Sequence, residues 1–129
     1  MAISPTQRTL AVLRKQGALS GVVEKWNSYV KIRQDLFGFV DLIAIRGRQI
    51  VAVQCCAGSG HAAHRTKILA NEIAPYWLKA GGLIEIWSWS KTKVKLKAGG
   101  WGKAVRWTPR VEPITPEMFT CPTEPGPNA

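Results

Sequence analysis

Two short apolar runs joined by a glycine-containing turn constrain the fold of this chain more than any other feature. The first covers residues 38–45 and the second residues 50–56, with Arg46-Gly47-Arg48-Gln49 between them. Runs of this length on either side of a turn are typical of paired antiparallel strands. Both runs are almost continuously apolar, which favours the interior of a sheet over its edge. We therefore expect a β-hairpin at the centre of the domain.

Helix signals flank this hairpin on both sides. Ser4 followed by Pro5 is a common helix start, and Gly17 predicts where this first helix ends. A second helix is expected from His61 to about Lys79, with Pro75 kinking it or beginning a new helix. Helical spacing predicts that the following residues face the core: Leu69, Ile73, Tyr76, Trp77 and Ala80.

Further apolar segments predict the remaining strands. Residues 18–26 and 83–89 are expected to be strands, and residues 103–111 an edge strand at the C-terminal side. Five prolines from Pro113 onward predict that regular structure ends there. The order of elements predicts one α/β domain over residues 1–112, with a mixed sheet flanked by helices and an extra C-terminal strand. Residues 113–129 are expected to form a Pro-rich tail.

The charge of the chain is its first functional signal. Eighteen Lys and Arg residues against eight Asp and Glu residues give a formal net charge of +10. The excess is spread over the whole sequence, so it is not a basic tail on a neutral body. Such a balance favours a polyanionic partner, and we expect DNA.

Other classes of protein are disfavoured by the sequence. No apolar run reaches the ~20 residues that a membrane-spanning helix needs, and the first fifteen residues lack the features of a secretory signal. We therefore expect a cytoplasmic protein without a membrane partner. Three cysteines, two of them adjacent, form neither a disulfide framework nor a zinc-binding spacing.

Two polar residues interrupt the apolar hairpin at positions that can hold a cation. Asp41 lies near the start of the first run, Gln54 lies near the end of the second, and Cys56 follows on the same strand face. Mg²⁺ prefers oxygen ligands and keeps several waters, so one or two carboxylates and a carbonyl can suffice. An alternative is that Asp41 is a turn residue and Gln54 belongs to a buried hydrogen-bond network.

This hairpin resembles the D-x(n)-(D/E)-x-K hairpin of the PD-(D/E)XK, or restriction-endonuclease-like, nuclease superfamily. The resemblance covers roughly residues 4–90 and is to small resolvase-type and VRR-NUC-like members, with a degenerate motif. It implies an αβββαβ core and a metal-dependent nuclease of resolvase or repair type that acts on DNA. It further implies Mg²⁺ or Mn²⁺ as cofactor, and a homodimer that presents two sites to two strands.

The resemblance also implies roles for individual residues. Asp41 would bind the metal, with Gln54 in place of the second acid and the Cys55 carbonyl as a further ligand. Cys56 stands where the family has its lysine and cannot supply a positive charge. Lys67, on the following helix, would take over that role in catalysis. Glu24 is a possible additional acid.

Basic residues near this hairpin are the expected DNA contacts. Arg65, His61 and His64 lie near the start of the second helix, where backbone N–H groups also favour phosphate. Lys91 and Lys93 would share one face of an extended chain. Arg33, which precedes the hairpin, is also expected to contact DNA.

Two alternatives to a nuclease remain open. The missing second acid and lysine suit a catalytically inactive nucleic-acid-binding module of the same fold. A protein–protein adaptor, in which the basic charge serves only solubility, is the third reading. The first two predict nucleic-acid binding that weakens steeply as salt rises, and the adaptor does not.

Overall fold

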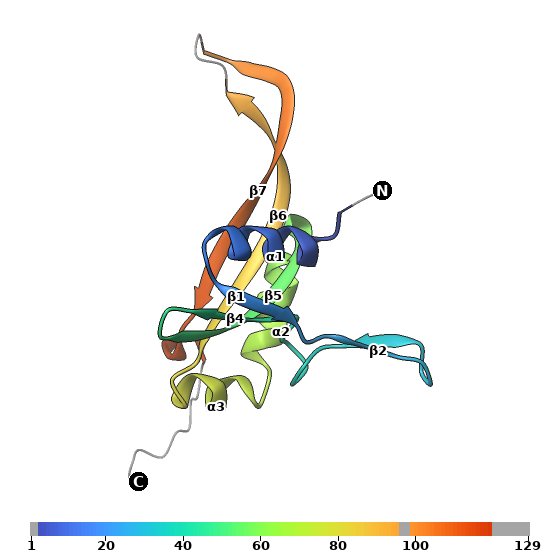
Figure 1. Cartoon of the computed structure of the whole chain (residues 1–129), viewed down its shortest axis with the longest axis vertical. Coiled ribbons are helices and arrows are strands. Elements are labelled where there is room, and N and C mark those ends of the chain that lie inside the picture. The colour runs from blue at the N-terminus through green and yellow to red at the C-terminus, as the bar shows by residue number, and fades with distance from the viewer. Residues whose placement is uncertain (1–2, 96–98, 120–129) are drawn as a thin grey trace.

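The computed structural model describes residues 3–95 and 99–119, and Figure 1 shows the path of the chain. A five-stranded sheet of order β1-β4-β5-β6-β7 forms the body, and a second sheet consists of β2 and β3 alone. The elements are α1 (Pro5–Lys15), β1 (Leu19–Val22), β2 (Lys25–Asn27), β3 (Ile32–Gln34), β4 (Leu42–Arg46), β5 (Gln49–Ala57), η1 (Gly58–Gly60), α2 (His61–Leu69), α3 (Ala74–Lys79), β6 (Leu83–Lys95), β7 (Trp101–Ile114) and η2 (Pro116–Met118).

The predicted hairpin is confirmed and lies inside the sheet. β4 and β5 pair antiparallel, with Leu42 opposite Val53 and Arg46 opposite Gln49. β5 then pairs parallel with β6, and α2 and α3 lie in the crossover between them. β1 and β7 close the sheet with antiparallel pairings. The sheet is therefore mixed, as the sequence predicts, and the protein is an α/β structure with helices flanking the sheet.

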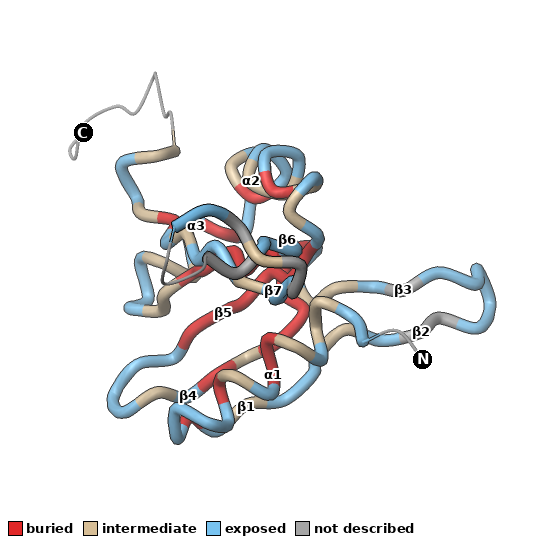
Figure 2. Tube along the Cα trace, turned by 90° about the horizontal axis from the view of Figure 1, so that it is seen from above, coloured by how far each residue is buried: buried red, intermediate tan, exposed pale blue. Residues whose placement is uncertain are grey.

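The sheet separates two apolar clusters. On one side α1 packs Leu10 and Leu13 against β4, β5 and β6, and Trp87 and Trp89 belong to this cluster. On the other side Ile68 of α2 and Ala74 of α3 pack against alternate residues of the same strands. Figure 2 shows β5 buried along most of its length, as expected for the central strand of a two-sided core.

The predicted long helix is in fact two helices, and the reason is local. The side-chain Oδ1 of Asn71 accepts hydrogen bonds from the backbone N–H groups of Ile73 and Ala74, at 2.7 and 2.9 Å. This Asn turn ends α2 and starts α3, with Pro75 in the first turn of α3. The break changes which side chains point inward. Tyr76 is 73% exposed and Ile73 is 40% exposed, so their prediction as core residues is wrong.

The predicted strand over residues 18–26 is also divided. β1 ends at Val22, and the chain then leaves the body as the β2–β3 hairpin, which projects sideways in Figure 1. At the other end β7 continues to Ile114, which is buried, and Met118 and Phe119 pack against the core. Regular structure therefore extends past Pro113, beyond the predicted limit. Residues 120–129 lie outside the described residues.

A second projection is formed by β6 and β7. β5 ends at Ala57, opposite Trp89, whereas β6 continues to Lys95 and pairs with β7 alone beyond that point. This two-stranded ribbon rises out of the body in Figure 1. In the part of the chain that the structure describes, no helix is long and apolar enough to cross a membrane.

Candidate metal centre

Asp41 and Gln54 are in direct contact. Asp41 lies immediately before β4, and its backbone is fixed on both sides, by hydrogen bonds to Val53 and from Val23. Its side chain is 4% exposed, and Oδ2 accepts hydrogen bonds from Gln54 Nε2 at 2.6 Å and from the Cys55 backbone N–H at 2.8 Å. The two polar residues singled out in the sequence therefore share one buried position between β4 and β5.

Two further carboxylates join Asp41. Glu24, Asp35 and Asp41 each offer one oxygen, and these oxygens lie within 4.8 Å of one another. The β2–β3 hairpin explains how they meet, because Lys25 pairs with Gln34 and so brings the flanking Glu24 and Asp35 together at its base. Three carboxylates at this separation repel one another unless a cation or protons intervene.

Burial and charge shift the ionisation of Asp41. The pKa of the Asp41 carboxyl is raised to about 7, mainly because the group is removed from water. The neighbouring Asp35 and Glu24 carboxylates contribute to this rise, and the hydrogen bond from the Cys55 backbone acts in the opposite direction. A bound divalent cation would favour the ionised form of all three carboxylates, so this group fits the hard-cation site expected from the sequence.

Gln54 supplies an unsatisfied oxygen beside this group. Its side chain is 2% exposed, and its Nε2 bonds to Asp41. Its Oε1 is buried and has no hydrogen-bond partner among the described residues. A buried acceptor without a donor is uncommon in folded proteins, and an amide oxygen is an ordinary ligand for Mg²⁺ or Mn²⁺.

Lys67 reaches the centre from α2. Its Nζ lies 3.0 Å from Asp35 Oδ2, so the lysine contacts the carboxylate cluster through Asp35. Ile68, the next residue, is fully buried and anchors this turn of α2 to the sheet. Asn71 also donates to the backbone carbonyl of Phe37 at 2.9 Å, so α2 holds the loop between β3 and β4 at two points.

Neither of the two adjacent cysteines supplies a positive charge to the centre. Burial raises the pKa of the Cys55 thiol to about 12, and burial also raises that of Cys56, so both thiols are neutral. The Cys55 side chain belongs to the α1 side of the sheet, together with Trp87. What Cys55 contributes to the centre is its backbone N–H, whereas its predicted role as a carbonyl ligand stays a prediction.

His61 has a structural role that conflicts with the predicted phosphate contact. It is 3% exposed, and its Nδ1 and Nε2 lie 2.6 Å from Ser88 Oγ and 2.7 Å from Glu112 Oε1. Arg65 Nε donates to the other Glu112 oxygen at 3.0 Å. Both ring nitrogens are thus occupied within the protein, and His61 has none free for a phosphate. Sequence reasoning missed this because a polar residue at a helix start is usually solvated.

Glu112 is the centre of this second network. Burial acts to raise its pKa, but the hydrogen bonds from His61 and Arg65 outweigh that effect, and the pKa lies below its ordinary value. Arg65 remains 41% exposed at its side chain, so its guanidinium is open to a further contact. His64 is half-buried, with Nδ1 2.9 Å from the Gly60 carbonyl.

The remaining predicted DNA contacts lie on the two projections. Arg33 is in β3, and Lys91 and Lys93 are exposed on β6. Lys91 Nζ lies 5.4 Å from the centre of the Trp107 ring, and Arg8 lies 4.2 Å from the same ring. No contact joins the described side chains of Lys91 and Lys93 to Asp35 or Asp41. Asp35, Arg106 and Arg110 were not singled out in the sequence.

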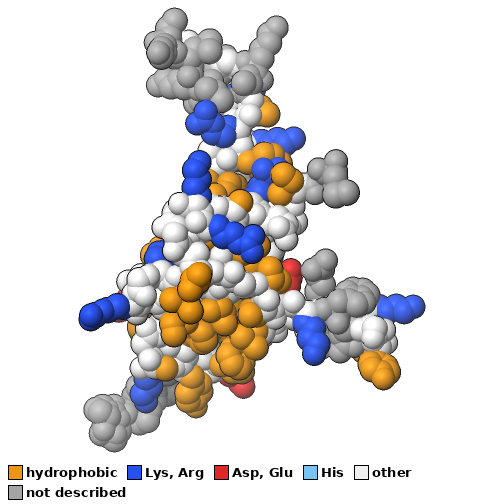
Figure 3. All heavy atoms as spheres, viewed as in Figure 1, with side chains coloured by type: hydrophobic (Ala, Val, Ile, Leu, Met, Phe, Trp, Pro, Cys, Tyr) orange, Lys and Arg blue, Asp and Glu red, His pale blue; other side chains and the backbone are white. Residues whose placement is uncertain are grey.

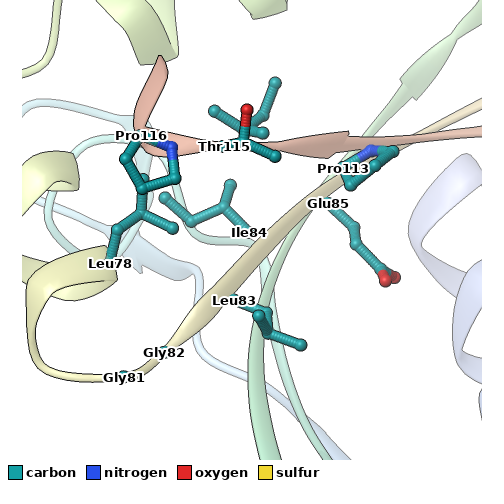
Figure 4. Close-up of a pocket in the computed structure, with 10 residues that line it drawn as sticks. Leu78, Gly81, Gly82, Leu83, Ile84, Glu85, Pro113, Thr115 and Pro116 are labelled. Atoms are coloured by element: carbon teal, nitrogen blue, oxygen red, sulfur yellow. The ribbon is translucent and has the colours of Figure 1, made fainter. Parts of the chain in front are cut away.

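The apolar cavity in Figure 4 is a separate feature. It has a volume of about 320 Å³ and lies between α3 and the end of β7, lined by Leu78, Ile84 and Pro116 among others. Figure 4 also shows the Glu85 carboxylate turned away from the cavity, and this group bonds Arg46 at 2.9 Å. Glu85 is the one carboxylate among its lining residues, and it is paired with Arg46, so the cavity is separate from the carboxylate cluster.

Comparison with known proteins gives no match. No family model, no curated protein and no solved structure matches this chain. The chemistry of the centre formed by Glu24, Asp35, Asp41, Gln54 and Lys67 is therefore the main indication of function.

Proposed function

We propose that this protein is a Mg²⁺- or Mn²⁺-dependent nuclease that cleaves phosphodiester bonds in DNA. The observation that carries the proposal is the buried Asp41–Gln54 pair next to Glu24 and Asp35, with no donor to Gln54 Oε1 in the described part of the chain. Three neighbouring carboxylates, of which Asp41 is buried, together with a buried amide oxygen suit a divalent cation. The net charge of +10 suits a polyanionic substrate.

The residues of the centre would have two roles, metal binding and contact with the phosphate or the attacking water. Asp41, Asp35 and Glu24 would hold the cation, with Gln54 Oε1 as a neutral ligand. A bound divalent cation stabilises charge on a phosphate and lowers the pKa of a coordinated water. Lys67, beside Asp35, can donate to a non-bridging phosphate oxygen or orient the attacking water. Its flexible stem and compact charge suit such a contact.

The fold supports the same proposal. The order α1, β1, β4, β5, α2, β6 corresponds to the αβββαβ core that the superfamily resemblance implies, with β2–β3 inserted and β7 added. The carboxylate at the start of β4 and the amide on β5 occupy positions that correspond to the hairpin of that motif. We therefore assign the protein a restriction-endonuclease-like core as part of the proposal.

The test is plasmid nicking in Mg²⁺, Mn²⁺ or EDTA. We expect nicking by the wild type with either metal and none in EDTA. Asp41→Asn should abolish nicking, because the amide keeps the size of the side chain but removes a charged ligand. Glu117→Gln is the matched control, since it removes one exposed carboxylate on η2 and should leave nicking unchanged. A wild type inactive in both metals would refute the nuclease.

A catalytically inactive DNA-binding module is the second candidate. The observation that favours it is the neutral Gln54 in the position of the second acid, with the neutral Cys56 in the position of the lysine. This candidate predicts salt-sensitive DNA binding by both the wild type and Asp41→Asn, with no nicking by either protein.

A further inference from the structure

The ribbon of β6 and β7 is the most strongly basic segment of the chain. Residues 90–111 contain seven Lys and Arg residues and no Asp or Glu. Figure 3 shows Lys and Arg side chains distributed along it, where it stands clear of the body. Lysines often protect an exposed edge strand from aggregation. That role does not explain the arginines, whose placement depends on the register of the two strands.

The register divides the ribbon into two faces. Residues directly opposite each other in an antiparallel pair lie on the same face. One face carries Lys91 opposite Trp107 and Lys93 opposite Val105, and it continues from the α1 side of the sheet through Trp89. The other face carries Ser88 opposite Arg110, Ser90 opposite Thr108 and Thr92 opposite Arg106. We call the second one the arginine face.

The arginine face continues from the side of the sheet that holds the carboxylate centre. At its base, Ser88 bonds His61 of α2, the helix that also supplies Lys67. Gln54 alternates with Ala52 and Cys56, both of which belong to the cluster on the α2 side. Gln54 pairs with Ile86, so Thr92 is six residues further along β6, or ~20 Å at ~3.3 Å per residue.

The side chains on this face are available to a ligand. Arg106 and Arg110 are exposed, and neither guanidinium forms an ion pair with a carboxylate in residues 3–95 or 99–119. Thr92 and Thr108 lie between them, with their hydroxyl oxygens 3.5 Å apart. From Ser88 to Thr92 and from Arg106 to Arg110, the face thus combines two arginines with small hydroxyl side chains and no bulky apolar residue. Arginines and hydroxyls are the groups that most often contact phosphates and base edges.

We propose that the arginine face is a DNA-binding arm that enters the major groove of a duplex whose scissile phosphate lies at the carboxylate centre. This inference rests on the proposed nuclease function and makes duplex DNA the substrate. The major groove of B-form DNA admits a two-stranded β-ribbon, whereas the deep major groove of A-form RNA does not. The ~20 Å from Gln54 to Thr92 is less than one turn of a DNA duplex, ~34 Å.

The test compares two double variants that each remove two positive charges. Arg106→Gln/Arg110→Gln changes the arginine face, and Lys91→Gln/Lys93→Gln changes the opposite face. Fluorescence anisotropy in EDTA measures binding to a labelled 20-base-pair DNA duplex and to one of its strands alone, over a range of salt. Both variants are first checked for wild-type thermal unfolding. If the arginine pair is unstable, the single Arg106→Gln replaces it.

We expect the arginine variant to bind the duplex at least about tenfold more weakly, with a salt slope reduced by roughly 1 to 2. Its binding to the single strand should change less than about threefold. The lysine variant should lose less than about threefold on either probe. If Lys91 and Lys93 contact the DNA, as the sequence predicts, the lysine variant should instead show the larger loss of binding. The two variants therefore decide which face binds DNA.

Three results would overturn the proposal that the arginine face binds duplex DNA. They are equal losses for both variants, no loss for the arginine variant, or a loss on the single strand as large as that on the duplex. Plasmid nicking separates this inference from the proposed function. If the protein is a nuclease but the arginine face does not bind DNA, the arginine variant will nick plasmid like the wild type. An inactive wild type whose arginine variant binds the duplex poorly refutes the nuclease and keeps the arm.

Discussion

Gln54 and the Cys55 backbone both donate to the same oxygen of Asp41, at 2.6 and 2.8 Å, from consecutive residues of β5. The carboxylate is therefore fixed in orientation by one strand while its own backbone belongs to the next. A carboxyl group held in this way does not need to change its orientation when a cation binds. This arrangement underlies the first three predictions.

Changing Gln54 should alter metal affinity more than stability. Gln54→Glu places a second ionisable carboxylate against Asp41, so we expect Mn²⁺ affinity to rise by roughly tenfold near pH 8, where a cation can separate the two charges. Gln54→Leu removes the ligand oxygen and the donor to Asp41, and it should weaken Mn²⁺ binding by about 10- to 100-fold. Isothermal titration calorimetry measures both, and equal affinities for the three proteins would exclude Gln54 from the centre.

The pKa of Asp41 predicts how stability depends on pH without metal. The folded protein holds this proton up to about pH 7, whereas the unfolded chain releases it near the ordinary carboxyl pKa of 3.8. Between these values the folded state binds more protons, so the free energy of unfolding should fall as pH rises, by on the order of a few kcal/mol. Urea unfolding in EDTA at pH 5 and pH 8 measures the change. In Asp41→Asn this contribution should be absent. If the free energy of unfolding of that variant still falls with pH as steeply as in the wild type, the effect does not come from Asp41.

Metal binding should compete with the same proton. Because a cation requires ionised carboxylates, Mg²⁺ should raise the melting temperature more at pH 8 than at pH 6. A concentration ten times the dissociation constant corresponds to about 1.4 kcal/mol of stabilisation. A thermal-shift series in MgCl₂ and, as an ionic-strength control, in NaCl provides the measurement. A Mg²⁺ effect that is equal at both pH values would argue against binding through Asp41.

Lys67 should matter for cleavage and little for stability. Its side chain is 43% exposed, so its ion pair with Asp35 is worth at most about 1 kcal/mol. Lys67→Met should reduce the single-turnover nicking rate by about 100-fold or more if the ammonium contacts the reacting phosphate or water. Lys79→Met, an exposed lysine in the last turn of α3, is the control. Similar rates for the two variants would remove Lys67 from the mechanism.

Glu112 should contribute to stability through α2. Glu112→Gln keeps the shape of the side chain but weakens the bonds from His61 and Arg65, with an expected loss of about 1–3 kcal/mol in the free energy of unfolding. Because the pKa of Glu112 is lowered in the folded state, its contribution exists above its unfolded pKa and disappears as pH falls. Urea unfolding over a series from pH 7 to pH 3 tests both statements. A loss that does not become smaller toward the acid end of the series would contradict this role of the charge.

The sequence predicted the parts of the centre that belong to strongly patterned strands. Asp41 and Gln54 interrupt two apolar runs, and the pairing of those runs brings them together. Asp35 could not be found in this way, because it lies in a polar segment without periodicity, and only the β2–β3 pairing places it beside Glu24. The burial of His61 could not be predicted for a related reason, since its partners Ser88 and Glu112 are 27 and 51 residues away.

The connection between α2 and the loop after β3 has a consequence for the whole centre. Phe37 and Gly38 both adopt positive φ angles, of 57° and 83°, in a tight turn that the Asn71 side chain fastens from outside, while Lys67 holds Asp35. Asp35 is thus positioned by α2, which is not part of the central β4–β5 hairpin. A small shift of α2 along its axis would change the distance between the carboxylates before any strand pairing was lost. The centre can therefore lose its affinity for a cation while the sheet stays intact.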